Sequence, residues 1–318
     1  MIQFGCSLLG SSVDEDRSFE MDDYQAATAR WCSGCGDHAV LAAVQRLLAE
    51  KQLLPEETMV VSGIGCSSRF PHYVNSYGFH GLHGRALPVA TGVKLRRPEL
   101  NVFVVMGDGD CCSIGAGHWI HTTRYNPNMV ALMLDNGVYG LTKNQTSPTS
   151  PVGLKSNTNP NRGALLHPMN PIATTLGVEN ASFVAQTGDW VPDHIYAVLK
   201  AAFEHRGFSF VRILQRCPQY TDQLFLNYMR DPNTIELLVH PDGVDVPSLG
   251  SLYKNKTYHD PSDLVGAFQL AQLDDKIRLG VFYRNEDRPV YEEVRAVPAK
   301  TADEKIAILN EELDRYAV

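Results

Sequence analysis

The stretch Gly107–Asn136, GDGDCCSIGAGHWIHTTRYNPNMVALMLDN, predicts the unit around which the rest of the chain is organised. It follows an apolar run, Val102–Met106, that is typical of a buried strand. A helix-compatible segment, Ser113–Tyr125, comes after the glycine-rich turn, and a second apolar strand, Met129–Leu134, comes after that. Strand, turn, helix and strand in this order indicate a βαβ unit with two parallel strands.

Each of these two predicted strands is followed by a residue with a polar side-chain oxygen. Asp108 stands between Gly107 and Gly109, which allow a tight turn and a close approach of backbone to a ligand, and Asn136 follows the second strand. Parallel strands bring both residues to the same edge of the sheet. One carboxylate and one amide oxygen suit Mg²⁺, which takes its other ligands from phosphate and water. We expect Asp110, in the same turn, to cap the next helix.

Length and composition limit the class of protein. The chain has 318 residues, 44% hydrophobic and 20% charged, which fits one large or two ordinary globular domains. No run approaches the roughly 20 apolar residues of a membrane span, and the first residues lack the pattern of a signal peptide. We therefore expect a cytoplasmic protein that does not bind a membrane. The net charge of −8 argues against nucleic acid as a partner.

The alternation of strands and helices up to about residue 220 predicts an α/β fold with a doubly wound, mostly parallel sheet. We expect an N-terminal arm at 1–27, an α/β domain at 28–235 and a C-terminal extension at 236–318. Residues 146–163 are rich in Pro, Ser, Thr, Asn and Gly and predict a long loop. Further elements are expected at Met59–Ile64, Pro171–Gly177, Ser182–Ala185, Asp193–Phe203, Phe208–Leu214, Leu237–Val239, Leu264–Leu273 and Gly280–Tyr283.

The chain contains seven cysteines, and this odd number in a chain expected in the cytoplasm favours metal or redox use over disulfides. Four of them stand at the ends of predicted elements: Cys32, Cys35, Cys66 and Cys217. Such a set could bind zinc, bind an iron–sulfur cluster or act as a dithiol, and composition does not separate these. We interpret Cys6, Cys111 and Cys112 as structural, with the last two beside the Asp108 turn.

Several motifs resemble one known family. GDG followed by Asn at this distance looks like the motif that binds thiamine diphosphate through Mg²⁺. WCSGCG at 31–36, GIGCSS at 63–68 and the Cys-Pro pair at 217–218 are similar to the β subunit of the 2-oxoacid:ferredoxin oxidoreductases. The resemblance covers roughly residues 28–220 and implies the sheet of that family's thiamine diphosphate-binding domain. It also implies one 4Fe–4S cluster on Cys32, Cys35, Cys66 and Cys217, and Mg²⁺ on Asp108, Asn136 and the backbone carbonyl of Val138.

The resemblance further implies a coenzyme A-dependent oxidative decarboxylation of a 2-oxoacid that is reversible and passes electrons through the cluster to ferredoxin. Lys143 favours 2-oxoglutarate, and hence succinyl-CoA and CO₂ as products, because an ammonium there would compensate a second carboxylate. The residues expected to contact the cofactor are Cys66, Ser67, His83, Gly107, Asp108, Gly109, Asn136 and Val138. Those expected to contact substrate are Lys143, His83 and Arg85.

No glutamate stands on the motif-bearing strand ends to activate the aminopyrimidine of the cofactor. In the resembled family this glutamate is supplied by a partner α subunit, which carries the pyrimidine-binding domain. The resemblance therefore implies an αβ or (αβ)₂ assembly that is inactive without that subunit.

Pyruvate or a branched-chain 2-oxoacid is an alternative substrate. An iron-free thiamine enzyme would leave the cysteines unused, and a zinc-binding scaffold is the alternative of another class. No G-x-G-x-x-G follows a strand as a nicotinamide dehydrogenase would require.

Overall fold

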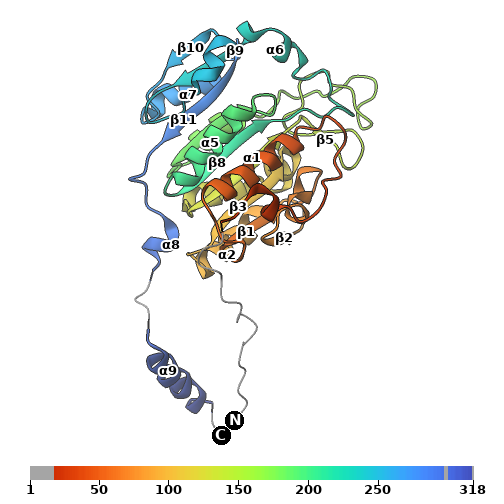
Figure 1. Cartoon of the computed structure of the whole chain (residues 1–318). Coiled ribbons are helices and arrows are strands. Elements are labelled where there is room, and N and C mark those ends of the chain that lie inside the picture. Colours follow the sequence, from red (N-terminus) through yellow and green to blue (C-terminus); the bar gives the residue numbers. More distant parts are fainter. Residues whose placement is uncertain (1–17, 297–299, 317–318) are drawn as a thin grey trace.

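The computed structural model describes residues 18–296 and 300–316, so Cys6 and most of the expected N-terminal arm lie outside the described residues. Its centre is a nine-stranded sheet with helices on both faces (Figure 1). The strands of this sheet are β1 (Thr58–Ser62), β2 (Tyr77–His80), β3 (Asn101–Gly107), β4 (Met129–Asp135), β7 (Phe183–Gly188), β8 (Phe208–Leu214), β9 (Ile235–Val239), β10 (Asn255–Tyr258) and β11 (Ile277–Arg284). Two short strands, β5 (Val138–Tyr139) and β6 (Gln145–Thr146), pair separately.

The sheet consists of two parallel blocks that meet at one antiparallel pair. Its order is β10-β9-β11-β7-β8-β4-β3-β1-β2, and only β11 and β7 run antiparallel among these neighbours. The expected doubly wound, mostly parallel α/β sheet is therefore confirmed. The division at 27 and 235 stays a prediction, and the second of these boundaries falls at the start of β9.

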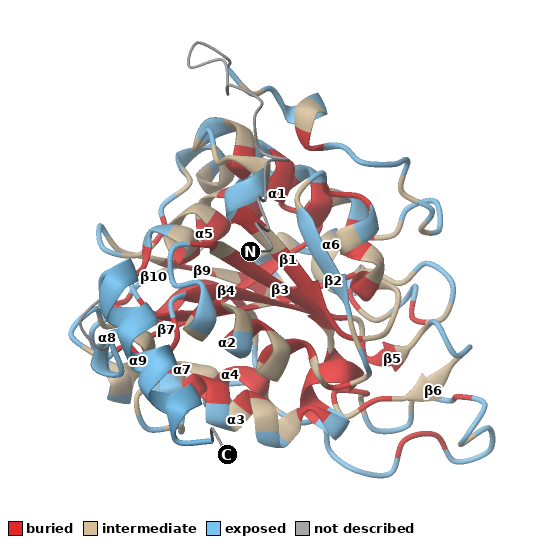
Figure 2. Cartoon of the chain, turned by 90° about the horizontal axis from the view of Figure 1, so that it is seen from below, coloured by how far each residue is buried: buried red, intermediate tan, exposed pale blue. Residues whose placement is uncertain are grey.

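Helices cover both faces of the sheet, as Figure 2 shows from below. Helices α1 and α5 pack on one face, and α2, α3, α4 and α7 pack on the other. The helices are α1 (Asp37–Glu50), α2 (Ala86–Arg96), α3 (Ala116–Tyr125), α4 (Pro171–Leu176), α5 (Pro192–Glu204), α6 (Leu226–Arg230), α7 (Leu264–Gln272), α8 (Tyr291–Val294) and α9 (Ala302–Asp314). Among the described helices, none combines the length and apolar character that crossing a membrane requires.

Strand β3 is apolar from Val102 to Met106 because both of its faces are covered there. Val102, Val104 and Met106 belong to the core under α2 and α3, whereas Phe103 and Val105 belong to the core under α1 and α5. Side chains alternate between the faces of a strand, so a strand inside a two-faced sheet must be apolar at every position. This burial holds the end of β3, and hence the turn after it, in a fixed place.

The register of the parallel strands brings the sequence motifs to one edge. Gly107 of β3 pairs with Leu134 of β4, so Asp108 comes next to Asp135. Asp135 pairs in turn with Leu214 of β8, so Asn136 comes next to Gln215. The residues that follow three adjacent strands therefore lie together at the carboxyl edge of the sheet.

The helix expected from Ser113 begins differently. A short π-helical turn, η4 (Asp110–Ile114), comes first, and α3 starts only at Ala116. Single π turns are frequent at functional sites, and this one adds a tight bend directly behind the Asp108 turn.

Helix α9 stands apart from the sheet (Figure 1). Thr301 caps it, with its side chain accepting from the backbone N–H of Glu304 while the Glu304 carboxylate accepts from the Thr301 N–H. Ile306, Leu309 and Leu313 follow the spacing of one helical face and are all exposed, each by more than half of its surface.

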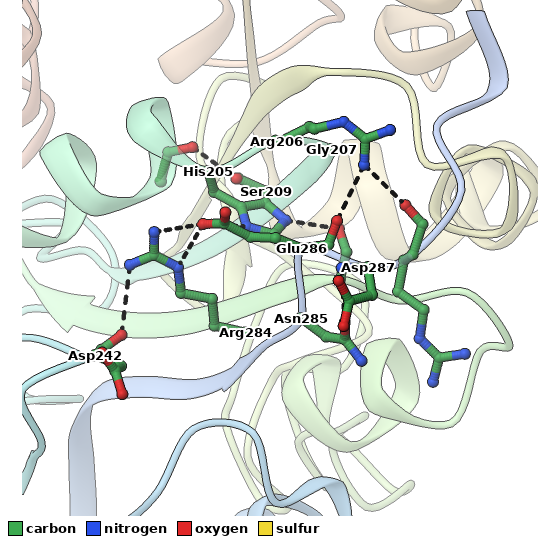
Figure 3. Close-up of polar contacts among 12 residues, drawn as sticks. His205, Arg206, Gly207, Ser209, Asp242, Arg284, Asn285, Glu286 and Asp287 are labelled. Atoms are coloured by element: carbon green, nitrogen blue, oxygen red, sulfur yellow. Dashed lines mark hydrogen bonds and ion pairs between the residues drawn. The ribbon is translucent and has the colours of Figure 1, made fainter. Parts of the chain in front are cut away.

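Two buried histidines make the stability of the fold depend on pH. His194 of α5 contacts Thr187, with Nδ1 2.8 Å from its Oγ1, and burial lowers the pKa of His194 to about 4. His205 contacts Ser182 through Nε2 at 2.9 Å, and burial, with Arg284 and Arg206 nearby, lowers its pKa to about 4 despite the opposing Glu286 (Figure 3).

Because the unfolded histidines titrate near 6.5, the unfolded chain binds protons between pH 6.5 and 4 that the folded chain does not. We expect the free energy of unfolding to fall by about 1–2 kcal/mol per histidine from pH 7 to pH 5. Urea unfolding at pH 7, 6 and 5 measures this loss. Buried carboxyls whose pKa is raised to about 7, Asp37 and Asp108, act in the opposite direction, so the contribution of the histidines is the difference between two chains. A chain carrying His194→Gln and His205→Gln should lose about 2–4 kcal/mol less stability than the wild type from pH 7 to pH 5, and an equal change in both chains would contradict the assignment.

Candidate active site

A cavity of about 270 Å³, which we call cavity 1, opens at the carboxyl edge between the ends of β1, β3 and β4. The chain leaves β1 toward β2 on one side and returns to β3 on the other, and ligands of open α/β sheets bind at such a reversal of strand order. Its walls include all residues expected to contact the cofactor: Cys66, Ser67, His83, Gly107, Asp108, Gly109, Asn136 and Val138. Their contact with a cofactor stays a prediction.

The turn after β3 requires glycine at position 109. The ring of Tyr139 lies where a Cβ of residue 109 would be, and the Tyr139 hydroxyl donates to the Gly109 carbonyl at 3.2 Å. A larger residue would displace Tyr139, which also lines cavity 1. The second glycine of the motif therefore lets the turn and the aromatic wall of the cavity pack together.

Asp108 is a buried carboxylate beside a second one. Its Oδ2 accepts from the Thr149 hydroxyl at 2.8 Å, and the same hydroxyl lies 2.7 Å from Oδ1 of Asp135. Burial, together with the charge of Asp135, raises the pKa of Asp108 to about 7. Arg212 neutralises Asp135, with Nη2 2.6 Å from Oδ2. Asp108 has no cationic partner of this kind in the described residues, and a divalent cation bound there would favour its ionised form.

The amide of Asn136 is held in one orientation. Its Oδ1 accepts from the Val138 N–H at 3.1 Å, and its Nδ2 donates to Oε1 of Gln215 at 2.7 Å. Gly137 turns the chain between them in the left-handed region, with φ of 67°. The amide oxygen keeps a second lone pair, so Asp108 and Asn136 line one cavity with oxygen donors, as a Mg²⁺ site requires.

A second cavity of about 350 Å³, cavity 2, adjoins the first. Cys66, Asn136, Gly140 and Leu141 line both cavities. The four cysteines at element ends, Cys32, Cys35, Cys66 and Cys217, all line cavity 2. The first two precede α1, Cys66 precedes the 3₁₀ segment η3 (Ser67–His72), and Cys217 follows β8, so three separate segments of the chain converge there.

The thiols of cavity 2 are poorly suited to act as a free dithiol. Burial raises the pKa of Cys35 far above its ordinary value, and the negative charge of the nearby Asp37 adds a smaller effect in the same direction. Burial also raises the pKa of Cys66, to about 11. Reactive thiols need the opposite shift, whereas a metal displaces the proton and stabilises the thiolate. Within the described residues, no three His, Cys, Asp or Glu side chains lie close enough to hold one metal ion.

The residues expected to contact substrate do not all line the same cavity. His83 lines cavity 1, and its Nδ1 lies 2.7 Å from Oδ1 of Asp110. Lys143 lines cavity 2 and has a left-handed backbone, with φ of 71°. Arg85 lines neither of these cavities, because its guanidinium donates to the carbonyls of Gly84 and Ile114.

The expected capping role of Asp110 is wrong. Gly109 occupies the cap position, and the Asp110 side chain does not reach the helical N–H groups. It turns toward the loops after β1 and β2 instead, where Oδ1 accepts from the backbone N–H of Ile64 and of Gly84. The π-helical turn causes this, since it places Asp110 inside the first turn. Cys111 and Cys112 are buried in the core beside this turn.

Sequence reasoning missed Thr149 and Gln215. Thr149 lies in the long loop predicted at 146–163, and its hydroxyl joins the two carboxylates at the site. Gln215 follows β8, and its side chain contacts both Asn136 and Cys35. The pairing of β4 with β8 brings Gln215 to Asn136, and the path of the long loop brings Thr149 to the two carboxylates, so no local pattern could have indicated either residue.

Comparison with known proteins is consistent with this geometry. Residues 63–213 match the family model described as "Thiamine pyrophosphate enzyme, C-terminal TPP binding domain", and residues 250–299 match the model for the C-terminal part of the pyruvate ferredoxin oxidoreductase beta subunit. The chain is 38% identical over 265 residues to 2-oxoacid:ferredoxin oxidoreductase 1, subunit beta, of Aeropyrum pernix, which covers 83% of this chain and 80% of that protein. The chain belongs to the family of 2-oxoacid:ferredoxin oxidoreductase β subunits.

Two further known proteins are also similar to this chain. 2-Oxoglutarate oxidoreductase subunit KorB of Mycobacterium tuberculosis is 49% identical over 196 residues, which are 62% of this chain and 52% of that protein, so this chain spans about half the length of that relative. A solved structure of 2-oxoglutarate:ferredoxin oxidoreductase from Magnetococcus marinus, with 2-oxoglutarate, coenzyme A and succinyl-CoA bound, superposes with a TM-score of 0.78 at 35% identity. The match covers 93% of this chain and 97% of that one.

Proposed function

We propose that the chain is the β subunit of a coenzyme A-dependent 2-oxoacid:ferredoxin oxidoreductase, with 2-oxoglutarate as substrate. The observation that carries the proposal is the pair of adjoining cavities, one lined by Asp108 and Asn136 and the other by four cysteines, with Cys66 in both walls. With both groups bound, such a pair would put the site of carbon chemistry directly beside an electron acceptor. The names of the M. tuberculosis and M. marinus relatives support 2-oxoglutarate over pyruvate or a branched-chain 2-oxoacid.

Cavity 1 fits thiamine diphosphate held through Mg²⁺. Asp108, Asn136 and the carbonyl of Val138 would hold the ion, and the glycine turn would let the backbone approach the diphosphate. When bound, the thiazolium of this cofactor supplies an electron sink for the carbanion left by loss of CO₂. Ser67 offers a hydroxyl at the same wall, and His83 offers the ring nitrogen that Asp110 does not hold.

Cavity 2 fits a 4Fe–4S cluster on Cys32, Cys35, Cys66 and Cys217. A cluster accepts single electrons, as transfer to ferredoxin requires. Trp31 supports the site from one side, because its Nε1 donates to the Cys66 carbonyl at 2.7 Å. Cys32 is the exposed member of the four, so we place the exit toward ferredoxin at this cysteine.

The proposed enzyme is completed by a partner α subunit. The β-subunit names of the relatives support such a partner, and we assign to it the activating glutamate and the pyrimidine-binding domain. We propose that the two subunits form an αβ or (αβ)₂ assembly in the cytoplasm. The chain alone should therefore bind cofactors without turning over substrate.

The proposal is tested by anaerobic co-expression with the partner subunit and measurement of iron, sulfide, zinc and thiamine diphosphate. We expect nearly equal amounts of iron and sulfide, together with bound thiamine diphosphate. Reduction of ferredoxin should require both 2-oxoglutarate and coenzyme A. Zinc without iron would support the scaffold alternative instead. Turnover by the β chain alone would contradict the shared active site.

Lys143 provides a test of the substrate. A charge-assisted hydrogen bond to the distal carboxylate contributes about 1.5–3 kcal/mol, so Lys143→Ala should lower kcat/KM for 2-oxoglutarate about 10- to 100-fold and leave that for pyruvate nearly unchanged. Lys143→Asn repeats the test with a residue that tolerates the left-handed backbone. Lys155→Ala, an exposed lysine of the nearby loop, is the control. An equal loss of kcat/KM for 2-oxoglutarate and for pyruvate would contradict the assignment of Lys143 to the distal carboxylate.

A further inference from the structure

Gln215 is a buried polar residue, 2% exposed, in the wall of cavity 2. It directly follows β8, and its backbone N–H donates to the Asp135 carbonyl at 2.8 Å, which continues the ladder between β8 and β4. Its side chain therefore projects from a fixed backbone. Among the residues that line cavity 2, Gln215 and Asn136 come from neighbouring strand ends.

The side chain of Gln215 contacts one candidate ligand of each metal site. Oε1 accepts from Nδ2 of Asn136 at 2.7 Å. Nε2 donates to Sγ of Cys35 at 3.2 Å and to the carbonyl of Arg216 at 2.6 Å. The amide has one acceptor oxygen and two N–H groups, and each of these three groups has a partner.

This pattern permits only one orientation of the amide. If the group were rotated by 180°, Nε2 would face the Asn136 N–H groups and Oε1 would face a carbonyl and a thiolate. In the observed orientation, Asn136 turns its N–H group toward Gln215 and its oxygen toward the Val138 N–H, and Cys35 receives an N–H donor. One side chain thus sets the direction of a magnesium ligand and the hydrogen bonding of a cluster ligand.

We propose that Gln215 is a positioning residue that joins the thiamine site to the iron–sulfur site, orienting Asn136 for Mg²⁺ and tuning the cluster through Cys35. The proposal rests on the proposed function. Partners behind a ligand orient it, and their loss costs about 10- to 100-fold in metal affinity. A hydrogen bond to a ligating thiolate stabilises the more negative, reduced cluster and so raises its potential.

The test uses the complex co-purified with its partner subunit and two variants at Gln215. Gln215→Leu removes both contacts, so affinity for Mg²⁺ and thiamine diphosphate should fall about 10- to 100-fold, as measured by calorimetric titration of cofactor-depleted protein. The cluster should also become harder to reduce, by about tenfold in the reduction equilibrium or about 59 mV, as measured by an electron paramagnetic resonance redox titration.

Gln215→Glu separates the two effects. At pH 8 its carboxylate keeps an acceptor for Asn136, so cofactor affinity should stay closer to wild type than in Gln215→Leu. The same carboxylate removes the donor to Cys35 and adds negative charge, so the potential should fall at least as far as in Gln215→Leu. A purely structural role would lower thermal stability and iron content in both variants without this split.

Gln269→Leu is the matched control, because Gln269 is an exposed glutamine of α7 that lines neither cavity 1 nor cavity 2. It should leave both measurements at wild type. Unchanged affinity in Gln215→Leu, or an unchanged potential in both Gln215 variants, would overturn the coupling while the wild type still contains iron, sulfide and thiamine diphosphate. A wild type that lacks these groups would instead overturn the proposed function.

Discussion

Replacing Asp108 with asparagine is expected to lower the affinity for Mg²⁺ and thiamine diphosphate by about 100-fold or more and to abolish ferredoxin reduction. Asp108 would supply the only formal negative charge among the three proposed ligands. Loss of residues behind a ligand already costs about 10- to 100-fold, so loss of a charged ligand should cost at least as much. Calorimetric titration of the cofactor-depleted complex measures the affinity directly.

The same substitution should not destabilise the cofactor-free protein. Asp108 is buried beside Asp135, and this raises the pKa of Asp108 to about 7, so the structure disfavours its charge. An asparagine of equal size still accepts from Thr149 and removes the repulsion. Cofactor affinity should therefore fall while the unfolding temperature without cofactor is unchanged or higher.

Asp135→Asn supplies the contrast, because it leaves Arg212 without its carboxylate. Breaking a largely buried ion pair from one side is destabilising by about 3 kcal/mol, so this variant should unfold more easily without cofactor. If Asp108→Asn were destabilised to the same degree as Asp135→Asn, Asp108 would be a structural residue and the ligand assignment would fail.

Replacing Cys217 with alanine is expected to remove the cluster and reduce ferredoxin-linked activity more than about 100-fold, since a direct ligand matters at least as much as the groups behind it. The protein should lose its brown absorbance and most of its iron and sulfide. Cys217 lines cavity 2 but not cavity 1, so Mg²⁺ and thiamine diphosphate should still bind. Iron analysis and cofactor titration on one preparation test both expectations.

Cys112→Ala is the control for this variant. Cys112 is buried in the core, where its Sγ lies 3.5 Å from Sδ of Met133. Its loss should cost some thermal stability and leave iron and sulfide at the wild-type level. A Cys217→Ala protein that kept its full iron content would show that another residue completes the site.

The central βαβ unit was predictable because its signal is strong and local. Strands β3 and β4 are buried on both faces and read as apolar runs, and the glycines mark the turn between them. The confirmed family also follows from short motifs, which precede α1 or lie at the ends of β1, β3, β4 and β8. Strands β2 and β10 were missed, because β2 is exposed at every position and β10 at every second one, and exposed edge strands lack an apolar pattern.

Contacts between elements were the part that the sequence could not supply. Thr149 sits in a polar loop and looks like any other loop threonine until the fold brings it to Asp108. Gln215 owes its contacts to the pairing of β4 with β8, which are about 80 residues apart in the chain. Asp110 had the residue type of a helix cap, but a π-helical turn changed the direction of its side chain.

Helix α9 has a consequence for how the chain behaves in solution. An isolated helix of its length, 13 residues, is marginal in water, and α9 contributes no buried side chain to the described fold. Its capping box favours the helical state, but without packing the helix should fray and its amide hydrogens should exchange rapidly. Slow exchange at Ile306, Leu309 and Leu313 in a purified assembly would therefore mean that α9 folds on contact with another chain.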